Sequence, residues 1–135
     1  MEYKPKLEWL VVHSTETEFG LDVSISEINS DHKERFGIIG FSDIIDFEGN
    51  ITGTYSLYDY RNCKPYDWGL KNSRHVAYIG GLSEDGFYKV DTMSPEQKET
   101  LDVYIMYMKR RHPNLKVINS RDLNSCKKKD TIQTL

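Results

Sequence analysis

Apolar residues occur in short runs separated by polar segments, and the run around which the chain is organised lies near the N-terminus. Residues Glu8 to His13 are almost continuously apolar, which is typical of a central strand covered on both faces. Similar runs bounded by turn residues predict four more strands, over residues 38–47, 51–56, 74–79 and 116–118. A tight turn over residues 48–50 joins the first two of these as a hairpin.

Two segments have the spacing of helices with capping residues at their starts. Ser24 and Glu27 have capping-box spacing, and Gly37 can take the left-handed conformation that ends a helix near Phe36. A second helix begins after Ser94 with the same pattern. It carries an apolar stripe at helical spacing, which predicts core contacts for Leu101, Tyr104, Ile105 and Met108.

The predicted order is strand, helix, hairpin, long loop, strand, helix, strand. This order predicts an α/β (mixed) fold, a central mixed β-sheet flanked by helices, and a single domain over residues 1–135. The long loop, residues 57–73, has no periodicity but holds several aromatic side chains, so we expect it to be functional. We expect the tail from about residue 124 to be loosely held.

Composition disfavours several classes of function. The net charge of −3 gives no electrostatic case for nucleic acid or an anionic membrane, and no apolar run approaches membrane-spanning length. The first residues lack the apolar core of a secretory leader, which predicts a cytoplasmic protein. Cys63 and Cys126 are too few for a disulfide scaffold and indicate free thiols or a metal ligand.

His13 is the first candidate for chemistry, because it ends the apolar strand and small polar residues follow at once. Functional side chains often lie where a rigid strand leads into a polar loop. A histidine there can equally be a core residue that is hydrogen-bonded to a backbone carbonyl. We expect no function for His32 and His112, which we place on helix surfaces or ends.

Several stretches together resemble the zinc-dependent N-acetylmuramoyl-L-alanine amidases, the family that includes amidase-type phage lysozymes and peptidoglycan recognition proteins. They follow the family's order and spacing, and they are Leu10–Thr17, Ile39–Ile45 with the Glu48–Gly49 turn, Asn72–Leu82, Asp91–Lys98 and Val117–Leu123. The resemblance covers about residues 7–126 and implies the amidase fold. Phage and mobile-element genomes are a usual setting for that fold.

The resemblance also implies a metal site, from which this chain departs. His13 stands where the family has its first zinc ligand, but Ser120 stands where the family has a second histidine. Cys126 lies near the position of the third ligand, about two residues early. Phe41 replaces a tyrosine that polarises the substrate carbonyl, and Asn124 replaces a lysine of the phage enzymes.

These departures leave fewer metal ligands than a catalytic zinc needs. A catalytic zinc takes about three protein ligands and one open position, and a serine hydroxyl is a poor ligand at neutral pH. We therefore expect no cofactor and less than one zinc per chain. In a rearranged alternative, His75 replaces a family glycine on the same strand face as Ala77, and zinc is held by His13, His75 and Cys126.

The sequence thus favours a non-catalytic member of the amidase fold that binds or sequesters a small ligand, muropeptide-like or nucleotide-like, in the ancestral cleft. The predicted ligand-binding residues are His13, Phe41, Tyr66, Trp68, Arg74, His75 and Tyr78. Such a phage or mobile-element protein would act on a host pathway in the host cytoplasm. Two alternatives remain: an active zinc-dependent amidase that hydrolyses the amide between N-acetylmuramic acid and L-alanine, and a protein-binding inhibitor or adaptor. We expect neither nucleic acid nor membrane as a partner.

Overall fold

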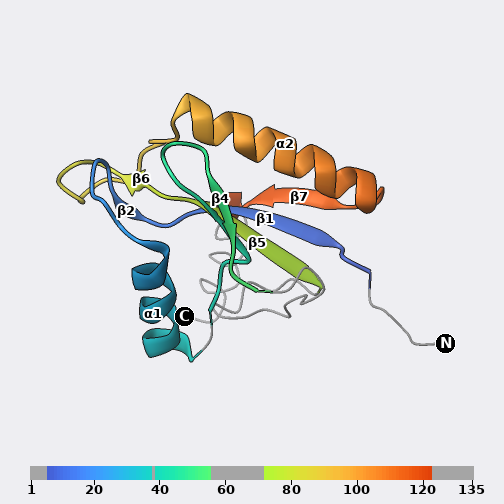
Figure 1. The fold of residues 1–135 in the computed structure, drawn as a ribbon, viewed down its shortest axis with the longest axis horizontal. Coiled ribbons are helices and arrows are strands. Elements are labelled where there is room, and N and C mark those ends of the chain that lie inside the picture. Colours follow the sequence, from blue (N-terminus) through green and yellow to red (C-terminus); the bar gives the residue numbers. More distant parts are fainter. Residues whose placement is uncertain (1–5, 38, 56–71, 123–135) are drawn as a thin grey trace, which may run out of the picture.

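A five-stranded mixed sheet forms the centre of the molecule. The computed structural model describes residues 6–37, 39–55 and 72–122. The strands lie in the order β4-β3-β5-β1-β7, with only the β3–β4 hairpin antiparallel among the described strand pairs. Their bounds are β1 Trp9–Ser14, β3 Asp43–Ile45, β4 Ile51–Gly53, β5 Ser73–Tyr78 and β7 Lys116–Asn119. The predicted α/β class and central mixed sheet are confirmed (Figure 1).

β1 lies inside the sheet, as its apolar run predicts, between the parallel strands β5 and β7. β3 is shorter than the strand predicted over residues 38–47. Before it, the Gly40 N–H donates to the His32 side chain and not to a neighbouring strand, whereas the Ser42 N–H already donates to the His75 carbonyl of β5. The regular strand begins at Asp43.

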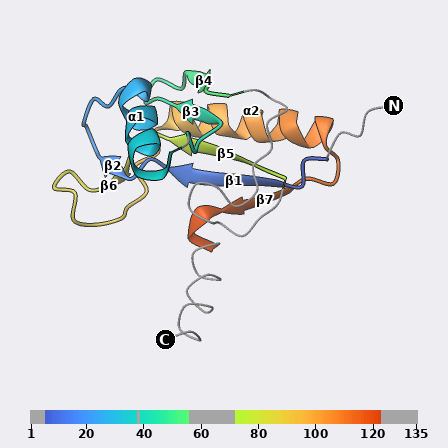
Figure 2. The ribbon, with the colours of Figure 1, turned by 90° about the horizontal axis from the view of Figure 1, so that it is seen from below.

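One helix covers each face of the sheet. α1 (Ile25–Phe36) and α2 (Pro95–Arg111) lie on opposite sides of it (Figure 1), and in the view from below α1 lies in front and α2 behind (Figure 2). Both helix starts are confirmed. The Ser24 hydroxyl accepts from the Glu27 N–H at 3.1 Å, and Ser94 forms a complete capping box. Gly37 ends α1 at φ 76°, the left-handed conformation that glycine adopts without strain.

Side-chain alternation along the strands sorts the core into two layers. Leu10 and Val12 of β1 join the core under α2, whereas Val11 lies in the core under α1. The predicted stripe of α2 lies in the first of these, with Leu101 and Met108 buried. His13 follows the parity of Val11, which places its imidazole on the α1 side of the sheet.

A second, two-stranded sheet lies beyond the carboxyl end of β1. It pairs β2 (Thr17–Glu18) with β6 (Gly81–Leu82) in parallel. The sequence predicted a loop at β2, because a two-residue strand has no periodicity to detect. Gly81, at φ 101°, is required there, since a Cβ would overlap the Ser14 side chain.

Two predicted segments fall outside the described residues: most of the loop over residues 57–73, and the tail from about residue 124. Among the described residues, no helix is long and apolar enough to cross a membrane.

Gln97 fastens α2 to the sheet, and its loss should destabilise the fold. Its buried side-chain amide donates to the carbonyls of Ile45 and Ile79, both at 3.1 Å, and its oxygen accepts from the Ser94 N–H. Gln97→Leu removes three hydrogen bonds and leaves the buried Ile79 carbonyl without this donor, whereas the Ile45 carbonyl still accepts from the Ile79 N–H. We therefore expect it to lower the free energy of unfolding by about 2–4 kcal/mol in urea titrations. Lys98→Leu, on the exposed side of the same turn, is the control and should cost less than about 0.5 kcal/mol. Equal losses in the two variants would contradict this role for Gln97.

Candidate functional site

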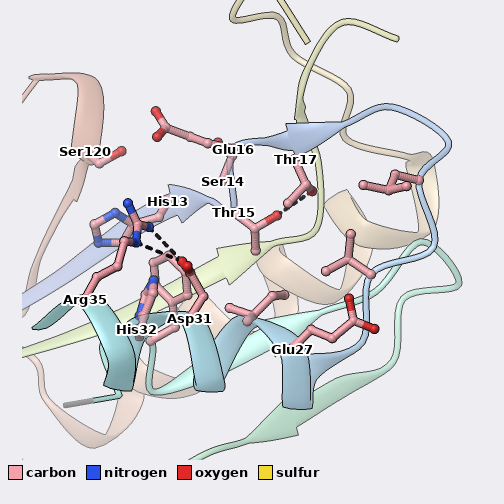
Figure 3. A pocket seen from close by; sticks show the side chains of 14 residues that line it. His13, Ser14, Thr15, Glu16, Thr17, Glu27, Asp31, His32, Arg35 and Ser120 are labelled. Atoms are coloured by element: carbon pink, nitrogen blue, oxygen red, sulfur yellow. Dashed lines mark hydrogen bonds and ion pairs between the residues drawn. The ribbon is translucent and has the colours of Figure 1, made fainter. Parts of the chain in front are cut away.

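A pocket opens at the carboxyl end of β1, between the loop that follows this strand and one face of α1 (Figure 3). Its volume is about 610 Å³. The lining combines hydroxyls, carboxylates, imidazoles and a few apolar side chains: His13, Ser14, Thr15, Glu16, Thr17, Leu21, Val23, Glu27, Ile28, Asp31, His32, Arg35, Phe41 and Ser120. Size and mixed polarity suit a small polar ligand.

The deepest polar feature of the site is a chain of three buried side chains. His13 Nε2 lies 3.0 Å from His75 Nδ1, and Ser73 Oγ lies 2.9 Å from His75 Nε2. A neutral imidazole has one N–H and one acceptor nitrogen, so His75 donates to one neighbour and accepts from the other. The two imidazoles and the hydroxyl thus satisfy one another in a place from which water is largely excluded.

His13 is neutral in this environment. Burial, and to a lesser extent the positive charge of a protonated His32, lowers the pKa of His13 from 6.5 to about 3. The imidazole is therefore a hydrogen-bonding group and not a cation at neutral pH.

His32 belongs to the site, contrary to the expectation that it lies on a helix surface without a function. It is buried on the inner face of α1, and its Nδ1 accepts from the Gly40 N–H at 3.1 Å. Burial lowers the pKa of His32, consistent with this acceptor role. The Phe41 ring lies between the two imidazoles, with centroids 4.7 Å from His32 and 5.3 Å from His13.

The mouth of the pocket is more acidic than basic. Glu16, Glu27 and Asp31 contribute carboxylates, against the single guanidinium of Arg35 among the described lining residues. Arg35 and Asp31 face each other one helical turn apart, with an N–O distance of 2.8 Å (Figure 3). Glu16 adopts φ 56°, a strained conformation for a residue with a Cβ, and pairs with Lys89 at 3.0 Å.

Arg74 lies on the opposite face of the sheet. Its side chain is fully buried, 3.4 Å from Asp43, and the Tyr104 hydroxyl donates to the same carboxylate at 2.6 Å. Tyr78 packs against the core beneath α2. The structure thus separates Arg74 and Tyr78 from the pocket by the thickness of the sheet, and we do not carry them into the proposed site.

Of the other predicted ligand residues, His13 and Phe41 line the pocket, and His75 lies fully buried behind His13. Tyr66 and Trp68 fall outside the described residues. The sequence prediction did not include α1 in the site, although a pattern in the sequence indicates that this helix contributes polar side chains to it. Polar residues recur there at helical spacing on the face that also holds Ile28, and they are Glu27, Asp31, His32 and Arg35.

The donor set in the described part of the chain does not fit a catalytic zinc. His13 and Ser120 line the same pocket, as the resemblance implies, but His13 Nε2 is engaged by His75. No group of three or more His, Cys, Asp or Glu side chains in the described residues could hold a metal ion. The rearranged set of His13, His75 and Cys126 stays a prediction, since Cys126 lies outside them.

The low pKa of His13 predicts a pH dependence of stability. The unfolded state binds a proton near the ordinary pKa of 6.5, whereas folded His13 binds one only near about 3. As the pH falls between these values, His13 should therefore cost the fold about 1.4 kcal/mol per pH unit. We expect His13→Gln to have a shallower slope of unfolding free energy against pH than wild type. His112→Gln, at the end of α2, should flatten the slope less, because burial and Arg111 lower the pKa of His112 by a smaller amount. The same slope in wild type and His13→Gln would contradict a neutral buried imidazole.

Solved structures with this fold are peptidoglycan amidases and recognition proteins. The chain superimposes on N-acetylmuramoyl-L-alanine amidase LysC from Clostridium intestinale with a TM-score of 0.68 at 17% identity, covering 87% of this chain and 73% of the amidase. The endolysin of a Thermus scotoductus bacteriophage gives 0.66 at 17% identity, over 90% and 75% of the two chains. Bumblebee peptidoglycan recognition protein SA gives 0.61 at 19% identity, over 90% and 77%. No protein-family model matches the sequence, and no curated protein is detectably similar to it. At these identities the likeness establishes the fold, which is that of the amidases and peptidoglycan recognition proteins.

Proposed function

We propose that this chain binds a muropeptide-like fragment of peptidoglycan in the pocket at the end of β1, without hydrolysing it. The observation that carries the proposal is the contact between His13 Nε2 and His75 Nδ1, 3.0 Å apart in the buried floor of the pocket. The imidazole that the family resemblance would assign to a metal is instead satisfied within the protein. The pocket above it keeps its volume and its polar lining.

The charge of the lining favours a muropeptide over a nucleotide. A nucleotide phosphate would approach three carboxylates of the described lining, while the Arg35 guanidinium and the Lys89 ammonium are each already paired with one of them, Asp31 and Glu16. Sugar hydroxyls and peptide amides are neutral hydrogen-bonding groups. They match the hydroxyl-bearing residues of the lining, which are Ser14, Thr15, Thr17 and Ser120.

Two further features argue against hydrolysis. Phe41 has no hydroxyl to polarise a carbonyl, and Ser120 cannot replace an imidazole as a metal ligand at neutral pH. Loss of one electrostatic contribution of this kind typically costs ~3 kcal/mol of transition-state stabilisation. The active amidase is the alternative, and it would need donors that lie outside the described residues.

Calorimetric titration with muramyl dipeptide (N-acetylmuramoyl-L-alanyl-D-isoglutamine) tests the proposal. We expect binding to wild type and about tenfold weaker binding to Arg35→Ala, because this change removes N–H donors at the pocket mouth that can bind carbonyl oxygens of the dipeptide. Lys98→Ala is a matched control. It also removes the cation of an exposed i,i+4 ion pair, but on α2 and away from the pocket, and it should bind like wild type.

The same samples test for hydrolysis. After prolonged incubation with added zinc, mass spectrometry should recover the dipeptide intact. Release of L-alanyl-D-isoglutamine by wild type would establish the amidase alternative. Absence of binding, or equal weakening by both substitutions, would exclude the pocket as the binding site.

A further inference from the structure

The outward surface of α2 carries an apolar patch at its middle. The side chains of Val103, Met106 and Tyr107 are exposed by 60%, 55% and 47%, and Ile51 of the edge strand β4 is exposed beside them. A groove of about 420 Å³ lies between Ile51 and the helix. Single exposed apolar residues are ordinary, but a contiguous patch of this kind marks an interaction surface.

The same face of α2 has an acidic end and a basic end. At about 100° per residue, Glu96, Glu99 and Arg110 all lie within about 40° of Val103 around the helix axis. All three are exposed. Val103 is the middle residue of Pro95–Arg111, so the charges flank the apolar patch at nearly equal distances along the helix.

We propose that two copies of this chain associate through the outward faces of their α2 helices, which run antiparallel about a twofold axis at Val103. This arrangement brings Glu96 of each copy level with Arg110 of the other, and the two apolar patches meet at the centre. A parallel arrangement would instead place like charges side by side. A surface that is complementary to itself under a twofold rotation is what an isologous dimer requires.

The surface is ordered in advance of association. The Arg111 guanidinium donates to the Tyr107 hydroxyl at 2.9 Å and lies over its ring, which holds this aromatic side chain in place. Thr100 donates to the Gly49 carbonyl at 2.6 Å and fixes the hairpin turn beside the helix. Side chains that are already held lose less conformational entropy when a partner binds.

The dimer would leave both ligand pockets open. α1, which lines the pocket, and α2 lie on opposite sides of the sheet (Figure 1), so pairing through α2 directs the two pockets outward. The inference therefore does not depend on the proposed function, and each can fail without the other.

Sedimentation velocity of the full chain tests the surface. We expect wild type to dimerise in the micromolar range and Val103→Glu, which places two carboxylates face to face at the axis, to weaken the dimer at least about tenfold. Phe87→Glu is the control, because Phe87 is 83% exposed on a loop outside α2, and this variant should dimerise like wild type. A monomeric wild type throughout this range, or a dimer that Val103→Glu leaves intact, would overturn the proposal.

Charge reversal tests the antiparallel pairing. Glu96→Arg and Arg110→Glu should each weaken the homodimer, because each puts like charges level with one another. Mixing the two variants in equal amounts, or combining both changes in one chain, should restore dimers. Thermal melts verify that each variant is folded. Failure of both the mixture and the double variant to recover dimers would exclude this geometry.

Discussion

The parallel pairing of β1 with β5 is the constraint on which the rest of the molecule depends. It aligns Val11 with His75 and His13 with Ala77, which makes His13 and His75 diagonal neighbours on the α1 face of the sheet. Helices cover both faces, so these polar rings need partners inside the protein. They contact each other, and Ser73 completes the chain of hydrogen bonds. The neutral state of His13 follows from this burial.

The hydrogen bonds of His13 and the shape of the pocket depend on different parts of the structure. The pocket is formed by the loop after β1 and by α1, and hydrogen bonds within the protein hold the loop in place. Thr15, for example, is fixed by the Tyr78 carbonyl and by the Gly80 N–H, which donates to its hydroxyl. Under the proposed function, a fold shared with peptidoglycan amidases keeps the shape of its cleft while His13 is hydrogen-bonded within the protein.

Local features of the sequence predicted local features of the fold. The apolar run of β1 and the caps at Ser24 and Ser94 depend on residues within a few positions of one another, and each is confirmed. The burial of Arg74 depends on Asp43 and Tyr104, which are distant in sequence. No local pattern reveals these partners, so Arg74 was expected to bind the ligand. Strict alternation along β5 would have placed Arg74 opposite His75, on the other face. The position of His32 was predicted wrongly for a similar reason. α1 is polar on average, and this conceals that one face of the helix, on which His32 lies, is buried.

The state of the His13 imidazole is the central claim, and long-range ¹H–¹⁵N NMR spectra of the histidine rings test it most directly. The structure predicts that both His13 nitrogens keep the chemical shifts of a neutral ring from about pH 7 to about pH 5. It also predicts that the tautomers of His13 and His75 make the hydrogen bonds from His13 through His75 to Ser73 all run in one direction. Stoichiometric zinc should leave these shifts unchanged. A protonated His13 in this range, or a metal-bound shift when zinc is added, would contradict the account.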